Sequence, residues 1–123
     1  MDVYAENILD HYRHPRGKRR LPHPSVTHEE TNVSCGDSLT VDLAITDGVV
    51  REIGWEGSGC AISQAAISLL SEELPGTSLE KIDAFAPQDV YDLLGVPIGP
   101  RRVKCALLGL QAVQNAARAF QTP

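Results

Sequence analysis

The sequence has few cysteines and no long apolar run, and its first residues do not have the pattern expected of a secretion signal. Its 123 residues include three cysteines, an odd number that argues against a framework of disulfides and favours thiols that stay reduced. No apolar stretch approaches the roughly 20 residues that cross a bilayer. The first residues include Asp2 and Glu6 and lack the apolar region of a secretory signal. We therefore expect a cytoplasmic protein without a membrane partner.

Several common functional motifs are also missing. The chain contains no G-x-G-x-x-G, no Walker phosphate loop and no G-x-S-x-G, so no motif indicates a dinucleotide, a nucleoside triphosphate or a serine hydrolase. The net charge of −5 argues against a nucleic acid as the main partner. None of the four histidines forms a pair with metal-ligand spacing, so we interpret them as surface or packing residues: His11, His14, His23 and His28.

Positive charge is concentrated in one short stretch. Five of the 11 basic residues lie within residues 13–20: Arg13, Arg16, Lys18, Arg19 and Arg20. Such a run is usually a solvated loop. The alternative is a docking patch for an acidic protein partner.

The composition and the order of the periodic patterns predict one α+β domain over residues 1–123. Hydrophobic residues make up 42% of the chain, and the length suits a single domain. A helical pattern at the start ends at Pro15, and helices are expected at about 61–73, 78–84, 87–94 and 101–119. On the last helix, the expected buried stripe comprises Val103, Leu107, Leu110, Val113 and Ala117.

The middle of the chain alternates with a period of two. Apolar residues alternate with polar ones over 39–46, and Asp47-Gly48 follows, which predicts a hairpin. The return strand is expected to carry Val49, Ile53 and Trp55 on one face. Residues 26–33 form a weaker strand candidate. The prediction is a three-stranded antiparallel sheet with helices packed on one face.

The three cysteines stand at element boundaries. Cys35 precedes Gly36 and Asp37 at the entrance to a strand, Cys60 follows Gly59 before a helix, and Cys105 lies in the first turns of the last helix. A single free cysteine is often only a small buried hydrophobe. Together with Asp37, however, the three thiolates form a four-ligand set suited to tetrahedral Zn²⁺ or to iron–sulfur chemistry. A purely structural zinc module is disfavoured, because such sites usually use closely spaced cysteine pairs.

Four segments resemble the U-type scaffold proteins of iron–sulfur assembly, the family of IscU, SufU and the N-terminal domain of NifU. They are DHYRHPRG (10–17), NVSCGDSLTVDL (32–43), WEGSGCAISQAAISLL (55–70) and RRVKCALLGLQAV (101–113). The resemblance covers about residues 3–120 and implies the SufE/NifU-like fold. It also implies metal ligation by Cys35, Asp37, Cys60 and Cys105, with Zn²⁺ or alternatively iron or a 2Fe–2S cluster at the site. The implied partners are a cysteine desulfurase and downstream iron–sulfur assembly or carrier proteins.

Within this family, the motifs around the site look most like SufU. The stretch 57–63 and the stretch Arg102-Val103-Lys104-Cys105 follow SufU forms, and Lys104 stands where IscU has a histidine. The spacing of 45 between Cys60 and Cys105 is nearer to IscU, because SufU carries an extra segment there. The SufU resemblance implies a zinc-dependent relay of persulfide sulfur, with Cys35 as the acceptor.

The alternative is an IscU-like scaffold for a 2Fe–2S cluster, in which Cys105 is the acceptor. A sulfurtransferase-like activity is implied only in the SufU case. In either case, we expect Arg102 and Lys104 to tune the charge of the site without acting as ligands.

Overall fold

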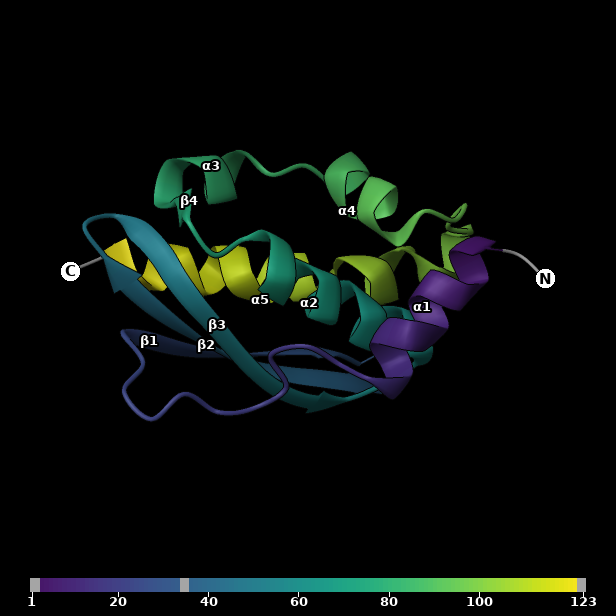
Figure 1. Ribbon diagram of the computed structural model, residues 1–123, viewed down its shortest axis with the longest axis horizontal. Helices are drawn as coiled ribbons and strands as arrows, with labels where there is room; N and C mark the ends of the chain where they lie inside the picture. Colours follow the sequence, from purple (N-terminus) through teal and green to yellow (C-terminus); the bar gives the residue numbers. More distant parts are fainter. Residues whose placement is uncertain (1–2, 34–35, 122–123) are drawn as a thin grey trace.

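The computed structural model describes residues 3–33 and 36–121 (Figure 1). The elements in chain order are α1 (Val3–Arg13), β1 (Val26–Asn32), β2 (Asp37–Thr46), β3 (Val49–Ser58), α2 (Ala61–Glu73), β4 (Thr77–Ser78), α3 (Leu79–Ala84), α4 (Pro87–Leu94), the short 3₁₀ helix η1 (Pro100–Arg102) and α5 (Val103–Gln121). The α+β prediction is confirmed, and the helix boundaries lie within about two residues of those expected. In this part of the chain, no helix is both long and apolar enough to cross a membrane.

The sheet has four strands in the order β1-β2-β3-β4, not the three predicted. The hairpin between β2 and β3 turns at Asp47 and Gly48, both with positive φ (54° and 71°), as in the type I′ turn that the Asp-Gly pair favours. The additional strand β4 has two residues, and Thr77 and Ser78 pair with Val50 and Val49. A segment of two polar residues carries no alternating pattern, so the sequence could not reveal it.

A register shift between β2 and β3 changes which residues of β3 face the core. Leu43 pairs with Ile53 but Ile45 pairs with Val50, so the ladder shifts between Ala44 and Ile45. As a result, Val50 is fully buried whereas Val49 is only half-buried. The prediction that Val49 shares the inner face was therefore wrong, because a bulge moves the alternation by one residue.

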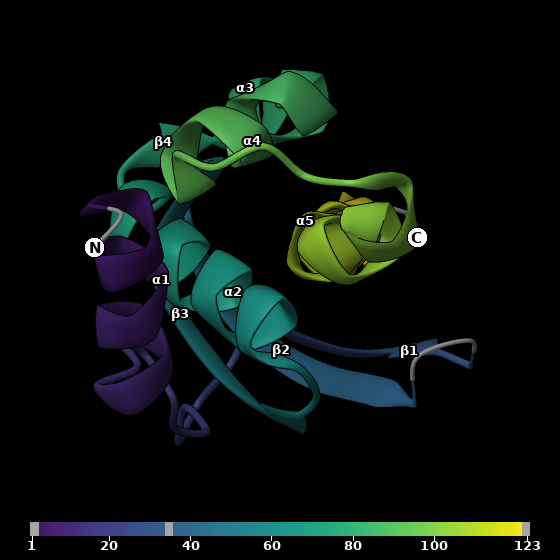
Figure 2. The ribbon, with the colours of Figure 1, turned by 90° about the vertical axis from the view of Figure 1, so that its right-hand side faces the viewer.

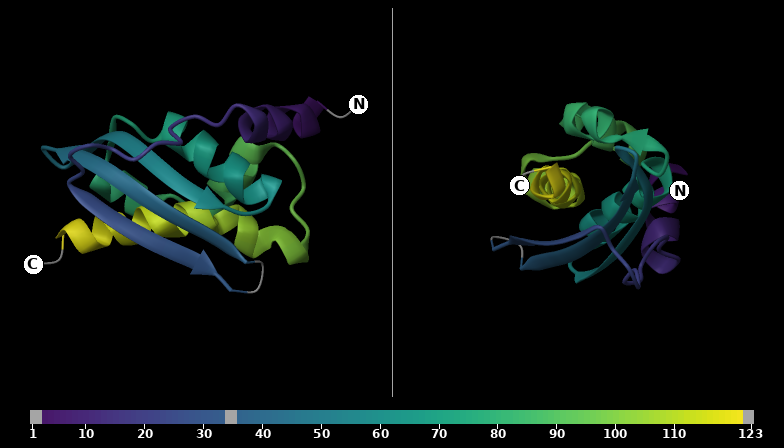
Figure 3. Two further views of the ribbon diagram at one scale, coloured as in Figure 1. Left: turned by 90° about the horizontal axis from the view of Figure 1, so that it is seen from below. Right: turned by 90° about the vertical axis from the view of Figure 1, so that its left-hand side faces the viewer.

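The sheet curves around α2 and α5, which pack on its inner face (Figure 3). Helix α1 packs against α2, while α3 and α4 cover the side of α5 away from the sheet (Figure 2). The core between these layers is mainly aliphatic, with Trp55 as its largest fully buried side chain. The helices thus lie on one side of the sheet, as predicted.

Residues 14–25 cross the outer face of the sheet without regular structure. They are anchored by Asp42, a fully buried carboxylate on β2. Asp42 accepts hydrogen bonds from the Arg20 guanidinium (2.7 Å), the Thr27 hydroxyl (2.6 Å) and the Leu21 backbone N–H (3.0 Å). Burial alone would raise the pKa of Asp42, but these donors outweigh it and hold that pKa below its ordinary value.

Helix α5 buries a broader face than the predicted stripe. Leu110, Val113 and Ala117 are buried as expected, but Val103 and Leu107 are only half-buried. The difference arises from small residues on the side facing α2. A Cβ on Gly109 would lie 3.2 Å from the Cβ of Ile67, so glycine permits the two helices to approach closely.

Candidate metal centre

Three elements begin at the same end of the molecule. Strand β2 begins at Asp37, α2 begins just after Cys60, and Cys105 lies in the first turn of α5. Figures 1 and 3 show these three starting points at one end of the long axis. The fold therefore gathers residues separated by 23 and 45 positions in the sequence.

The carboxylate of Asp37 and the thiols of Cys60 and Cys105 converge. One potential ligand atom from each residue lies within 4.8 Å of the other two. Among the described residues, this is the one group of three or more histidine, cysteine or acidic side chains arranged to hold a metal ion. Cys35, the fourth predicted ligand, lies outside the described residues, so its part in the site stays a prediction.

Asp37 is buried, and only one of its two carboxylate oxygens has a hydrogen-bond partner in the described structure. The residue is 2% exposed, and its Oδ1 accepts a hydrogen bond of 3.1 Å from the backbone N–H of Cys60. Its other oxygen, Oδ2, is buried and has no hydrogen-bond partner in the described structure. Buried carboxylate oxygens are normally paired, so an unpaired one among thiols indicates a position prepared for a cation.

The glycine before Cys60 permits this close approach. A Cβ built on Gly59 would lie 2.5 Å from Asp37 Oδ1 and 2.6 Å from the Ser63 hydroxyl. Real Cβ atoms do not come so near to other heavy atoms, so only glycine leaves room for the carboxylate at this position.

Both described cysteines lie at helix N-termini. Cys60 is the N-cap of α2, and its side chain makes no capping hydrogen bond. Cys105 is the third residue of α5 and is 4% exposed, whereas Cys60 is half-buried. The positive end of a helix dipole attracts negative charge, so both positions suit side chains that act as anionic metal ligands.

The donor set fits a soft or borderline metal ion. Two thiolates and a carboxylate are ligands of Zn²⁺ and of iron in proteins, and a tetrahedral site needs one further ligand. The unpaired Asp37 oxygen and the two nearby thiols together make the cluster suitable for a cation. The structure thus brings together three of the four residues that the sequence predicted.

The two predicted tuning residues stand beside the site without contacting its carboxylate. Arg102 ends η1 and Lys104 precedes Cys105 on α5, and both side chains are exposed. Neither pairs with Asp37 within residues 3–33 and 36–121. They are thus not ligands in the described geometry, and their electrostatic role stays a prediction.

The basic stretch at 13–20 is largely paired within the molecule. Arg16 contacts Asp10 and Glu72, Arg19 contacts Glu52, and Arg20 contacts Asp42. Lys18 lies over the Trp55 ring, 5.4 Å from its centroid. These pairs support the interpretation of this stretch as a structural loop over the interpretation as a docking patch.

One of the four histidines has a packing role, which is one of the two roles expected for them. His11 is buried on α1, and its Nδ1 is 2.8 Å from the Ser68 hydroxyl on α2. Burial lowers the pKa of His11 below its ordinary value, and the nearby Arg16 lowers it further against opposite effects of Glu72 and Asp10. His11 is therefore a packing residue that joins two helices, distant in sequence from the cysteines.

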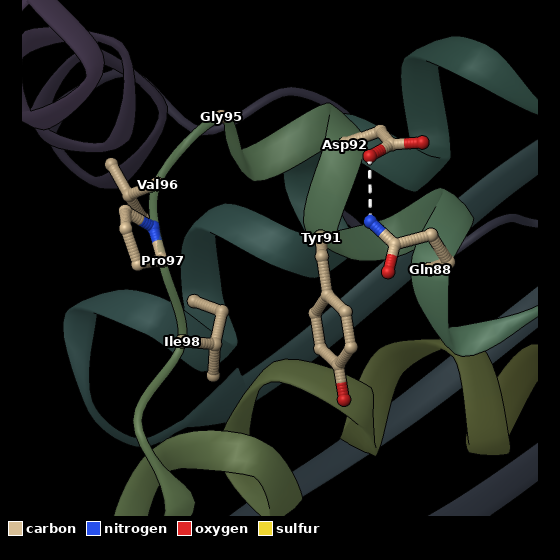
Figure 4. A pocket seen from close by; sticks show the side chains of 7 residues that line it. All are labelled: Gln88, Tyr91, Asp92, Gly95, Val96, Pro97 and Ile98. Atoms are coloured by element: carbon tan, nitrogen blue, oxygen red, sulfur yellow. Dashed lines mark hydrogen bonds between the residues drawn. The ribbon is translucent and has the colours of Figure 1, made fainter.

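A hollow of about 520 Å³ lies between α4 and the segment that follows it, away from the candidate ligands. Figure 4 shows Tyr91, Val96 and Ile98 on its walls and a hydrogen bond of 2.8 Å from Gln88 to Asp92. It gathers no set of thiols, histidines or acids. The hollow thus lacks the potential metal ligands that Asp37, Cys60 and Cys105 bring together.

One residue near the site was missed by the sequence interpretation. Asn32 ends β1, is 9% exposed, and pairs in register with Asp37. Its Nδ2 is buried without a partner in the part of the chain that the structure describes. A polar residue at the end of a strand is common, so only its register with Asp37 singles it out.

The chain matches the model of the NifU-like N terminal domain over residues 3–123. The chain belongs to this family. The family resemblance of the four motifs is confirmed by a match that includes every candidate ligand.

Relatives of this NifU-like domain carry two kinds of name. "Iron-sulfur cluster assembly scaffold protein IscU" from Thermotoga maritima is 31% identical and covers 98% of this chain and 96% of its own. "Zinc-dependent sulfurtransferase SufU" from Bacillus subtilis is 30% identical and covers 92% and 88%, respectively. Because the two sequence identities are nearly equal, they do not decide whether this domain is more similar to IscU or to SufU.

Solved structures share the fold. FiSufU from Fervidobacterium islandicum has a TM-score of 0.81 at 24% identity and covers 91% of this chain and 94% of its own. A NifU-like N-terminal protein from Brucella abortus has the same TM-score and identity, with 97% and 94% covered. The SufE/NifU-like fold expected from the sequence is therefore confirmed.

Proposed function

We propose that this NifU-like domain is an iron–sulfur cluster assembly protein that relays persulfide sulfur from a cysteine desulfurase and depends on zinc to do so. The observation that carries the proposal is the convergence of Asp37, Cys60 and Cys105 within 4.8 Å. Cys35 is the proposed fourth ligand. The relative named a zinc-dependent sulfurtransferase supports the relay, and the relative named a cluster assembly scaffold supports the coarser assignment to iron–sulfur cluster assembly.

Zinc, when bound, would keep the thiolates deprotonated and shielded until a partner docks. The proposed acceptor is Cys35, because Gly36 beside it has φ of 72° and the other two thiols are anchored on helices. Burial supports this choice, since Cys105 is 4% exposed. A nucleophile must reach a persulfide on another protein, which a buried thiol on a helix does poorly.

Sulfur transfer then proceeds as thiol–disulfide exchange. The Cys35 thiolate attacks the outer sulfur of the desulfurase persulfide, and a new S–S bond forms on Cys35. The S–S bond of the donor breaks, and its cysteine leaves as a thiolate. No net oxidation occurs, and the sulfur can pass onward to downstream assembly or carrier proteins by the same exchange.

The second candidate function is a scaffold on which a 2Fe–2S cluster is assembled and transferred, with Cys105 as the acceptor. The compact chain favours it, since the spacing of 45 between Cys60 and Cys105 is close to that of IscU. Here the cluster is cargo, built from iron and sulfide on the ligands named above. For either function we propose one domain over residues 1–123 acting in the cytoplasm.

Metal analysis of protein purified without oxygen tests these functions. One zinc per chain and a colourless solution are expected for the relay. Iron, acid-labile sulfide and a brown solution would favour the scaffold. Protein that binds neither metal, although folded, would contradict both functions.

Mapping the persulfide identifies the acceptor. The protein is mixed with a cysteine desulfurase and cysteine, and the modified residue is located by mass spectrometry. We expect the extra sulfur on Cys35 and its absence from Cys35→Ser. A persulfide on Cys105 that persists in Cys35→Ser would reject the relay route and favour the scaffold.

A further inference from the structure

Asn32 carries a hydrogen-bond donor that is buried and unused. The residue is 9% exposed, and its Nδ2 has no partner among residues 3–33 and 36–121. Leaving such a donor unpaired in a protein interior costs stability. An unpaired buried donor next to a reactive site therefore indicates a ligand that accepts a hydrogen bond.

The strand register places this donor at the candidate metal centre. Asn32 on β1 lies directly opposite Asp37 on β2. Residues directly opposite each other in an antiparallel pair project from the same face of the sheet, with Cβ atoms about 4.5–5.5 Å apart. Asn32 thus shares the face on which Asp37 meets Cys60 and Cys105.

A hollow of about 310 Å³ opens between Asn32 and the first turns of α5. Its walls are Thr31, Asn32, Val33, Lys104, Leu108 and Gln111. Lys104 and Leu108 flank Cys105 in the helix, at one position before it and three after it. The hollow is therefore lined by a residue next to Cys105 in the chain, Lys104, which carries an ammonium group, and by the residue paired with Asp37, Asn32, which carries an amide donor.

These two groups suit an anion. Asp37, Cys60 and Cys105 act as hydrogen-bond acceptors or anions when they bind a metal, so they would repel an anion unless donors lie nearby. Asn32 Nδ2 and Lys104 Nζ are both donors, and Lys104 is also cationic. An anion held between them would lie next to the metal centre.

We propose that Asn32 and Lys104 form a binding site for anionic sulfur, the terminal sulfur of a persulfide or free hydrosulfide. This inference rests on the proposed function, because it supplies the place where the incoming sulfur is held beside the ligands. Sulfur in this form is a small anion that accepts hydrogen bonds. The apolar Leu108 and Val33 walls suit a soft, weakly hydrated anion better than a strongly hydrated one such as sulfate.

The test uses cobalt(II), which reports thiolate ligation by its absorption in place of zinc or iron. Cobalt-loaded protein is titrated with sodium hydrosulfide, and the spectral midpoint gives the affinity. We expect Asn32→Leu, which keeps a similar size but has no donor, to bind hydrosulfide about ten- to a hundredfold more weakly. Lys104→Met, on an exposed position, should weaken binding in the same direction.

Asn115→Leu is the matched control. Asn115 lies on α5 facing β1, but its amide already donates to Glu30 (2.7 Å). Its loss should leave hydrosulfide affinity unchanged. A second arm uses cysteine persulfide and measures the rate of sulfur uptake by mass spectrometry. Weakening in this arm alone identifies a persulfide as the source, and weakening in the hydrosulfide arm alone identifies free hydrosulfide.

The outcomes separate this site from the function on which it rests. If wild-type protein does not bind cobalt through Cys60 and Cys105, the metal centre is wrong and the anion site is rejected with it. If cobalt binds normally but Asn32→Leu and Lys104→Met match wild type in both arms, only the anion site is rejected. Lys104→Met decides the question if Asn32→Leu does not fold.

Discussion

At the scale of single residues, the buried oxygen of Asp37 is the strongest sign of a metal site. Asp37 Oδ2 has no hydrogen-bond partner within the described part of the chain, although its residue is 2% exposed. We expect Asp37→Ala and Cys60→Ser each to lower zinc affinity at least tenfold, because each removes a proposed ligand. A competing chelator with a zinc-sensitive dye measures the affinity.

The control for these two variants is Asp92→Ala, which removes an exposed carboxylate on α4. It should bind zinc like wild type. Full zinc retention by folded Cys60→Ser would show that Cys60 is not a ligand.

We expect a substitution at Lys104 to affect sulfur uptake but not metal binding. Lys104→Ala should retain zinc, because the residue is exposed and makes no ion pair with Asp37 in the structure described. Its loss should slow persulfide uptake about tenfold by removing positive charge near an incoming anion. Stopped reactions analysed by mass spectrometry measure uptake, and Lys81→Ala is a surface control. Loss of zinc with the fold intact would instead place Lys104 among the ligands.

At the scale of elements, Gly59 permits the start of α2 to lie close to Asp37. Gly59→Ala would place a Cβ 2.5 Å from Asp37 Oδ1, so the carboxylate must move away from the thiols. We expect zinc affinity to fall at least tenfold while the helix itself persists. Calorimetric titration measures this change.

Gly99→Ala provides the matched control for the glycine substitution. A Cβ at Gly99 meets no atom within 4 Å among the described residues, and its φ of −72° suits alanine. It should bind zinc like wild type. Equal affinity of Gly59→Ala and Gly99→Ala would show that Asp37 does not need its present position.

Sequence patterns predicted the elements with clear periodicity but not the local irregularities. The alternation before Asp47-Gly48 and the capping Ser78, whose hydroxyl accepts from Lys81 N–H at 3.2 Å, are local signals that need no tertiary context. Strand β4 and the shift that buries Val50 depend on contacts between distant segments. The cysteines and Asp37 were predicted because their types and motif are distinctive, whereas Asn32 becomes notable only through its register.

At the scale of the whole molecule, Asp42 joins the basic loop to the sheet. Asp42→Asn replaces the carboxylate that accepts from Arg20, Thr27 and Leu21. We expect the free energy of unfolding to fall by about 2–3 kcal/mol, since buried donors lose a charged acceptor. Urea denaturation measures the loss, and Asp47→Asn in the exposed hairpin turn is the control. A change below about 0.5 kcal/mol would contradict this role.

The stability of the metal-free protein should fall as the pH is lowered. Burial depresses the pKa of His11, so the folded state disfavours the proton that the unfolded chain accepts near pH 6.5. The contribution of neutral His11 is fully present above that value and is lost below it. Asp42, whose pKa is also lowered, contributes above about pH 4 and loses its contribution as the pH falls further.

Urea denaturation at pH 7.5 and 5.5 in the presence of a chelator tests the histidine. Wild type should be less stable at pH 5.5, and the difference should shrink in His11→Asn. The exposed His14→Asn is the control and should behave like wild type. An unchanged difference in His11→Asn would assign the pH dependence to other groups.

Trp55 is the sole tryptophan of the sequence and is fully buried where the sheet, α2 and the loop of residues 14–25 meet. Its indole N–H donates to the Arg16 backbone oxygen (2.7 Å), and Lys18 lies over its ring. Its fluorescence is thus an internal probe of how this loop is seated. Trp55 is not one of the proposed ligands, so its emission should report unfolding and release of the loop. A change in fluorescence intensity during metal loading would therefore reveal a movement transmitted from the ligand end of the fold to the loop.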